Sequence, residues 1–282
     1  MYMITSNLFK NVLLGATAAV FVGAPLFPDH NQNGPLLQSA ITFVTPKADS
    51  VAAAHAVLPA NVRAAEVSTA LTALGKLVRP LSHPRALEEA FHGYFAYKAA
   101  HPADVKKPYL YFVDFGLPST TPRGYVFDMD NDTIVEGPFT VAHGRGSSTS
   151  KTGIPTNFSN RPGSAATSLG LYLAQEVYGF SGKSGGRSYA SVGLRLNGVS
   201  RGYNDNARPR GVVAHGAPYV TATTAGRSEG CPAMEPARAK RLLPKLANGG
   251  LVFLFAPRED WMASDQWLAA DGKVASGAVG PD

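Results

Sequence analysis

The stretch that decides the fold spans residues 211–243 and reads GVVAHGAPYVTATTAGRSEGCPAMEPARAKRLL. It begins with an apolar run, typical of a strand, that ends at His215. Cys231 follows sixteen residues later in a Ser-x-Gly-Cys turn. A helix is expected over residues 235–247, because Pro236 falls in its first turn and two glycines follow its end. The pattern is a strand, a long loop, a glycine turn that carries a thiol, and a helix.

The chemistry of a thiol explains why this arrangement is informative. A thiol with an ordinary pKa near 8.5 needs a basic or cationic neighbour, or a helix N-terminus, to be substantially ionised at neutral pH. His215 and the start of the helix are the two candidates. Gly230 lets the backbone approach a bound carbonyl, and the amides of Gly230 and Cys231 are candidates for an oxyanion hole. By itself a His-then-Cys pair is a weak signal, since unrelated thiol enzymes share it.

The whole stretch is more specific than the pair. H-G-A-x-Y-V followed by R-S-x-G-C-P-A-M resembles the signature of murein L,D-transpeptidases, in the branch where Pro-Ala follows the catalytic Gly-Cys. The resemblance covers about residues 108–257, with further likeness in TVAHGRG at 140–146, NFSNRPGSAATSLGLYLA at 157–174 and GYNDNARPRGVVAHGA at 202–217. It implies a mainly β (α+β) fold, an L,D-transpeptidase-type β-sandwich catalytic domain with one or two helices, preceded by a small helical segment.

The resemblance also implies a reaction and its residues. It makes Cys231 the nucleophile and His215 its base, with the backbone carbonyl of Gly216 orienting the imidazole. The thiolate would attack the amide between the L-centre of diaminopimelate and the terminal D-alanine of a tetrapeptide stem, leaving a thioester. An amine from a second peptidoglycan stem would then form a cross-link between two diaminopimelate residues. Water would instead give a shortened stem, as in an L,D-carboxypeptidase, and both outcomes use the same residues.

Four further residues are candidates for roles in the site. Arg227 and Ser228 could hold a substrate carboxylate or carbonyl through charge-assisted hydrogen bonds. His143, in a Gly-rich turn, is balanced between a substrate contact and an ordinary strand end. Glu229 stands where many members of the family have histidine, and its charge could raise the thiol pKa slightly. Substrate preference is the property that this departure puts in question.

Other readings of the same residues remain open. His143, His215 and Cys231 are all possible zinc ligands, but the glycine turn and the helix account for them without a metal, so neither a metal nor another cofactor is predicted. Papain-like amidases place Cys before His, the opposite order. A non-catalytic wall-binding module would keep the basic surface and treat Cys231 as a relic. A test of thiol reactivity separates that reading from an enzyme.

Composition narrows the class of protein. The chain has 282 residues, a net charge of +6 and only 16% charged residues, so its surface is mildly basic without the dense Lys and Arg runs of a nucleic-acid binder. An anionic polymer or a carboxylate-bearing substrate fits better. A single cysteine excludes an intramolecular disulfide. The oligomeric state is left open.

The N-terminus and the segments after it suggest an exported protein. Lys10 precedes an apolar run from Val12 to Ala24, a pattern typical of a signal peptide, which predicts the periplasm or cell envelope. Helical spacing predicts helices over 67–78 and 84–100. Glycine- and serine-rich stretches at 143–153 and 181–188 are expected to be long loops. The predicted segments are a signal peptide or anchor at 1–25, a linker at 26–64, a helical segment at 65–105, the catalytic domain at 106–258 and a peripheral tail at 259–282.

Overall fold

The structure, a computed structural model, describes residues 60–268. The predicted signal peptide or anchor at 1–25 and nearly all of the predicted linker fall outside these residues. Within the described part of the chain, no helix is both long enough and apolar enough to cross a membrane.

Two helices lead into the sheet. Helix α1 spans Ala60–Leu74 and continues into a short 3-10 turn, η1, at Gly75–Leu77, while α2 spans Ala86–Ala100. Both predicted helices are therefore present. The first begins earlier than expected, inside the segment predicted as a linker, because alanine-rich sequence extends the helix beyond its buried stripe. That stripe starts at Val67 and continues with Ala70 and Leu74, which is where periodicity first becomes visible.

The strands confirm a mainly β fold with few helices. Within residues 60–268 they form an eight-stranded sheet in the order β3-β2-β1-β10-β5-β6-β7-β9 and a two-stranded sheet of β4 and β8. Both two-residue strands on either side of the cysteine, β8 and β9, were too short to predict. The strands are β1 Tyr109–Asp114, β2 Gly124–Asp128, β3 Thr133–Phe139, β4 His143–Gly144, β5 Gly170–Ser184, β6 Arg187–Gly198, β7 Val213–Gly216, β8 Arg227–Ser228, β9 Ala233–Met234 and β10 Leu251–Phe255.

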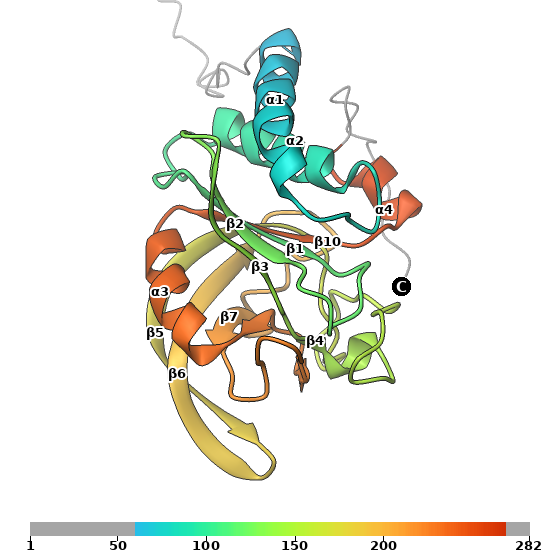
Figure 1. Cartoon of the computed structure of the whole chain (residues 1–282), viewed down its shortest axis with the longest axis vertical. Coiled ribbons are helices and arrows are strands. Elements are labelled where there is room, and N and C mark those ends of the chain that lie inside the picture. The colour runs from blue at the N-terminus through green and yellow to red at the C-terminus, as the bar shows by residue number, and fades with distance from the viewer. Residues whose placement is uncertain (1–59, 269–282) are drawn as a thin grey trace, which may run out of the picture. The chain divides into compact units, whose positions relative to one another are not determined.

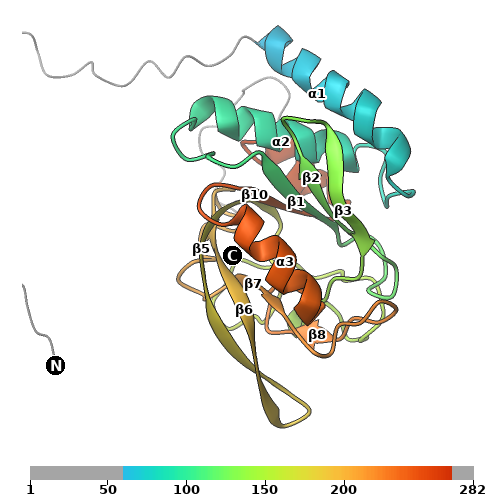
Figure 2. The ribbon, with the colours of Figure 1, turned by 60° about the vertical axis from the view of Figure 1, so that its left-hand side comes forward.

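Helices cover both faces of the central strands, so these strands are apolar on both faces. Strand β10 is buried throughout and pairs in parallel with β1. On the α2 side, Phe112 stacks with Phe253 at 6.5 Å between ring centroids. On the other face Tyr111 stacks with Phe139, over which the guanidinium of Arg238 from helix α3 (Pro236–Leu246) lies at 4.7 Å. Figures 1 and 2 show α1 and α2 on one side of these strands and α3 on the other.

The start of the predicted tail belongs to the core, which corrects the expectation of a peripheral segment from residue 259. Helix α4 spans Glu259–Ser264 and buries Trp261 and Met262. The Trp261 ring lies 5.9 Å from the rings of both Phe253 and Phe255, and its indole N–H donates to Asp265 at 2.8 Å. A tryptophan of this size buried against the sheet anchors the segment.

A second correction concerns the glycine- and serine-rich stretch at 181–188. It is not a long loop but the end of a β-hairpin, in which β5 and β6 pair as far as Ser184 and Arg187. Gly185 and Gly186 form the two-residue turn with φ of +56° and +79°, the backbone conformation that such a turn requires. Figure 1 shows the hairpin extending well beyond the rest of the sheet.

Candidate active site

The predicted nucleophile lies on a hydrogen-bonded turn between β8 and β9. The Ser228 hydroxyl donates to the carbonyl of Cys231 at 2.6 Å and accepts the N–H of Gly230 at 3.2 Å. Gly230 has φ of +120°, and a Cβ there would lie 2.9 Å from the carbonyl oxygen of Ala166, so the position requires glycine. Cys231 itself is partly exposed. The turn therefore presents one thiol on a constrained backbone.

The helix predicted over residues 235–247 is present as α3, Pro236–Leu246. Strand β9 separates Cys231 from α3, which starts at Pro236. The effect of a helix dipole falls off within the first turn of the helix. Help from the helix N-terminus in ionising the thiol therefore stays a prediction, since a two-residue strand that periodicity could not reveal lies between them.

Parallel pairing brings the predicted base to the nucleophile turn. His215 on β7 is in register with Ala233 on β9, and its backbone N–H donates to the carbonyl of Pro232, the residue after Cys231, at 3.3 Å. The ring nitrogen Nδ1 lies 3.1 Å from the carbonyl oxygen of Gly216. That contact with an acceptor assigns the proton to Nδ1 and leaves Nε2 free to accept one. The ring also stacks on Phe180 of the long hairpin, with centroids 4.2 Å apart.

Burial keeps both predicted catalytic groups uncharged at neutral pH. It lowers the pKa of His215 to about 4, although the bond to Gly216 opposes this shift. It raises the pKa of the Cys231 thiol, against the lowering effects of a backbone hydrogen bond from Val213 and the positive charge of Arg210. Glu229 raises the thiol pKa, in the expected direction and as the smallest of these effects. A neutral thiol and a neutral imidazole suit base-assisted attack rather than a preformed ion pair.

His143 lies behind the turn rather than at its surface. Its strand β4 pairs in parallel with β8, in register with Arg227, and its side chain is fully buried. The guanidinium of Arg123, also fully buried, donates to Nδ1 of His143 at 3.1 Å. The proton of the neutral ring is thereby assigned to Nε2. A substrate contact by His143 stays a prediction, and this geometry allows it only as a donor.

Arg227 and Glu229 both have partners within the protein. Arg227 donates through Nη1 to the carbonyls of Ser148 and Thr149, at 2.7 and 3.1 Å. It also lines a hollow of about 660 Å³ with residues 145–150, 153, 154, 156 and 157. Glu229 accepts from Arg145 with both oxygens at 2.8 Å. Arg227 therefore orders the loop beside the site. If Arg227 also contacts the substrate, as predicted, its guanidinium must bind the loop and the substrate together.

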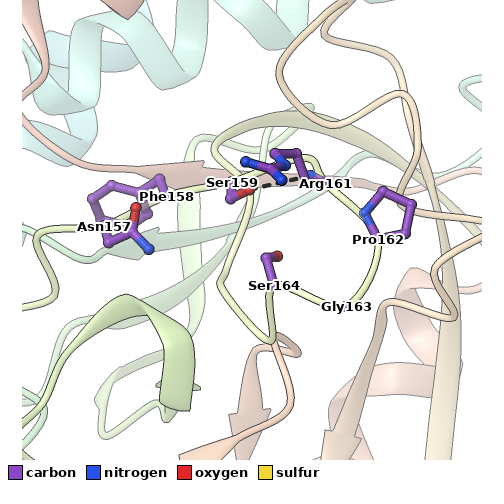
Figure 3. Close-up of a pocket in the computed structure, with 7 residues that line it drawn as sticks. All are labelled: Asn157, Phe158, Ser159, Arg161, Pro162, Gly163 and Ser164. Atoms are coloured by element: carbon purple, nitrogen blue, oxygen red, sulfur yellow. Dashed lines mark hydrogen bonds between the residues drawn. The ribbon is translucent and has the colours of Figure 1, made fainter. Parts of the chain in front are cut away.

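Except for Ser168, sequence reasoning did not single out the segment that lies beside the nucleophile turn. This segment, residues 159–168 and here called the 159–168 wall, approaches Gly230 through Ala166 and is hydrogen-bonded by Arg210. Part of the same segment lines a polar hollow of about 540 Å³ (Figure 3). These residues lie within the motifs that resemble the family, but only the fold places the segment beside Gly230 and Arg210. The lining residues are Asn157, Phe158, Ser159, Arg161, Pro162, Gly163 and Ser164.

No metal site is formed by the predicted residues. Within residues 60–268, no group of three His, Cys, Asp or Glu side chains is placed to hold a metal ion. His143 and His215 are instead engaged through Nδ1 by Arg123 and by the Gly216 carbonyl.

The two buried histidines should make the fold sensitive to acid. Burial lowers the pKa of both His143 and His215 from 6.5 to about 4. Between these values the unfolded chain binds protons that the folded chain does not. The contribution of the two histidines to the free energy of unfolding is therefore complete above about pH 6.5 and falls as the pH is lowered toward 4. At 1.36 kcal/mol per pKa unit, each histidine lowers the free energy of unfolding by about 3 kcal/mol over this pH range.

Urea unfolding between about pH 7 and pH 5 measures this dependence. Asp114 and Asp265, whose pKa values burial raises, contribute a slope of opposite sign. The comparison that isolates one histidine is therefore between the wild-type protein and His143→Gln, which should lose the slope of one proton. Equal slopes in the two proteins would mean that His143 is not held neutral by the fold.

The structure is a mainly β domain with a thiol on a glycine turn. The pairing of β7 with β9 brings a buried histidine to that turn. Residues 80–255 match the L,D-transpeptidase catalytic domain family. The chain therefore belongs to that family. The match begins within the segment predicted as separate helices, so it includes α2.

Several solved structures of L,D-transpeptidases are partly similar to this chain. They include an L,D-transpeptidase from Mycobacterium smegmatis, with 14% identity, a TM-score of 0.33 and coverage of 53% of this chain and 59% of that one. An L,D-transpeptidase from Stackebrandtia nassauensis has 16% identity, a TM-score of 0.34 and coverage of 68% and 77%. L,D-transpeptidase 3 from Mycobacterium tuberculosis has 12% identity, a TM-score of 0.31 and coverage of 52% and 61%. This chain thus spans about three fifths of the first and third structures. No curated protein sequence matches it.

Proposed function

We propose that this protein is an exported peptidoglycan L,D-transpeptidase that acts through a Cys231 thioester on tetrapeptide stems. One observation carries the proposal: in a chain of this family, the Gly230–Cys231 turn is hydrogen-bonded through Pro232 to His215, whose Nδ1 faces the Gly216 carbonyl. A cysteine nucleophile needs a base within reach, and that base needs a group that orients it. These three residues supply the thiol, the base and the orienting acceptor.

The first half-reaction transfers the stem to the enzyme. His215 Nε2 accepts the thiol proton as Sγ attacks the carbonyl between the L-centre of diaminopimelate and D-alanine. The C–N bond then breaks, the proton passes from His215 to the leaving amine, and D-alanine departs. The developing oxyanion is bound principally by the amide of Cys231, because the Gly230 N–H already donates to Ser228. The product of this step is a thioester on Cys231.

The second half-reaction regenerates the thiol. An amine from a diaminopimelate of another stem attacks the thioester carbonyl while His215 takes its proton and returns it to the sulfur. The product is a cross-link between two diaminopimelate residues. Attack by water would instead release a shortened stem, which is the L,D-carboxypeptidase outcome with the same residues.

The test is to incubate the purified protein and its Cys231→Ala variant with disaccharide-tetrapeptide muropeptides and to identify the products by mass spectrometry. We expect release of D-alanine together with cross-linked dimers, both absent from the variant. Release of D-alanine without dimers would replace the transpeptidase with a carboxypeptidase. The absence of any product that depends on Cys231 would overturn the proposal in favour of a wall-binding role.

A further inference from the structure

Arg210 lies on the loop before β7 and holds the 159–168 wall with both arms of its guanidinium. Nη1 donates to the carbonyl of Ser159 at 2.8 Å and to the hydroxyl of Ser168. Nη2 donates to the hydroxyl of Ser164 at 3.1 Å and to the carbonyl of Ala166 at 2.9 Å. The planar guanidinium, with five N–H donors, satisfies these four acceptors from two nitrogens, whereas the three donors of a lysine ammonium all leave one nitrogen.

The same guanidinium lies beside the nucleophile turn. A Cβ built on Gly230 would be 2.9 Å from the carbonyl oxygen of Ala166 and 3.7 Å from Nη2 of Arg210. A Cβ built on Gly144 would in turn be 2.8 Å from Cα of Gly230. The wall, the guanidinium and the turn therefore meet at Gly230, the residue before the thiol.

We infer that Arg210 is a positioning residue for Cys231, which fixes the 159–168 wall against the nucleophile turn and supplies the positive charge that favours the thiolate. The inference rests on the proposed function, because it assigns Arg210 to the same site. It also explains why an arginine is partly buried among main-chain carbonyls, where its desolvation would otherwise oppose folding.

Arg210 is the group near the thiol whose positive charge favours the thiolate. Glu229 acts in the opposite direction, and His215 is uncharged at neutral pH. Four tyrosines on β5, β6 and the loop after β7 interact with the thiol, but burial raises the pKa of each, so they are neutral as well. These tyrosines are Tyr172, Tyr178, Tyr189 and Tyr219. Among the described groups that act on the thiol, Arg210 alone is a cation.

The experiment measures the rate of alkylation of Cys231 by iodoacetamide against pH in the wild-type protein, Arg210→Gln and Arg210→Lys. Because the chain has a single cysteine, the reaction reports on this thiol alone. We expect the profile of Arg210→Gln to move to higher pH and its rate at about pH 7 to fall about tenfold. Arg210→Lys should keep a profile near that of the wild type but lower kcat/KM on muropeptides, because it retains the charge and loses the fork.

Arg208→Gln is the matched control. Arg208 lies two residues away and donates at 3.3 Å to Glu176 on the surface, so its removal should leave the alkylation profile unchanged. If Arg210→Gln does not fold, as judged by circular dichroism, Arg210→Met serves as the neutral variant.

Two results would overturn the inference. One is a folded neutral variant with the wild-type profile, and the other is a lysine variant displaced as far as the neutral one, which would show a purely structural role. Alkylation requires no peptidoglycan, so a wild-type protein that releases no D-alanine would refute the proposed function and leave this readout intact.

Discussion

Replacing Cys231 by alanine is expected to abolish both the release of D-alanine from tetrapeptide stems and the covalent capture of a carbapenem. We propose that a carbapenem acylates the same nucleophile as the peptide stem does, and Cys231 is the one thiol in the chain. Without Sγ neither thioester can form, so the loss should be on the order of 10⁴-fold or more. Mass spectrometry of the intact, reduced protein after incubation with a carbapenem would show the adduct on the wild type alone.

The backbone of the turn should survive this substitution. Ser228 bonds the carbonyl of residue 231 and the amide of Gly230, and neither contact uses the thiol. Thermal unfolding of the variant close to that of the wild type would show that the loss is chemical rather than structural. Cys231→Ser is the closer control in shape, and its hydroxyl should be far less reactive beside the same neutral base. Adduct formation by the alanine variant, or none on the wild type, would remove Cys231 from the proposed role.

The strands and helices that the sequence predicted are those whose burial leaves a pattern. Strand β7 is buried at every position, and the buried face of α3, which includes Leu242 and Leu246, recurs at helical spacing. Elements of two residues leave no such pattern, which is why the sequence did not predict β9 between the thiol and the helix. The stretch at 181–188 was misjudged for a different reason: its glycines mark a turn, but its polar residues gave no sign that two strands continue to meet there.

Some residues of the candidate site were predictable from the sequence, and others are shown only by the fold. Cys231, His215 and Gly216 lie in one stretch of the chain, so their proximity was predictable from a motif. Arg210 interacts with the 159–168 wall across more than forty residues, and its partners are main-chain carbonyls and serines that no motif distinguishes. The uncharged state of His215 was equally inaccessible, because it depends on burial and on the stacked ring of Phe180 from a hairpin that the sequence did not predict in full.

His215→Ala is expected to slow carbapenem acylation of Cys231 by about 10³-fold, within the range typical of losing a general base. The reason is that the thiol pKa is raised by burial, so little thiolate exists at neutral pH without proton transfer to Nε2. In the wild type the acylation rate should fall only as the pH approaches the pKa of about 4 of His215, since the imidazole must be unprotonated to act. Stopped acylation reactions read by mass spectrometry from about pH 4 to pH 8 would measure both effects.

The pH profile separates a base from a residue that merely supports the fold. His215→Ala should lose the acidic limb and regain rate as the pH rises toward the thiol pKa, where hydroxide replaces the missing base. His92→Ala, on α2 with its ring bonded to the Trp267 carbonyl, removes a remote histidine and should keep the wild-type profile. If His215→Ala folds and acylates at the wild-type rate, Cys231 ionises without it, and Arg210 alone would have to account for the reactivity of the thiol.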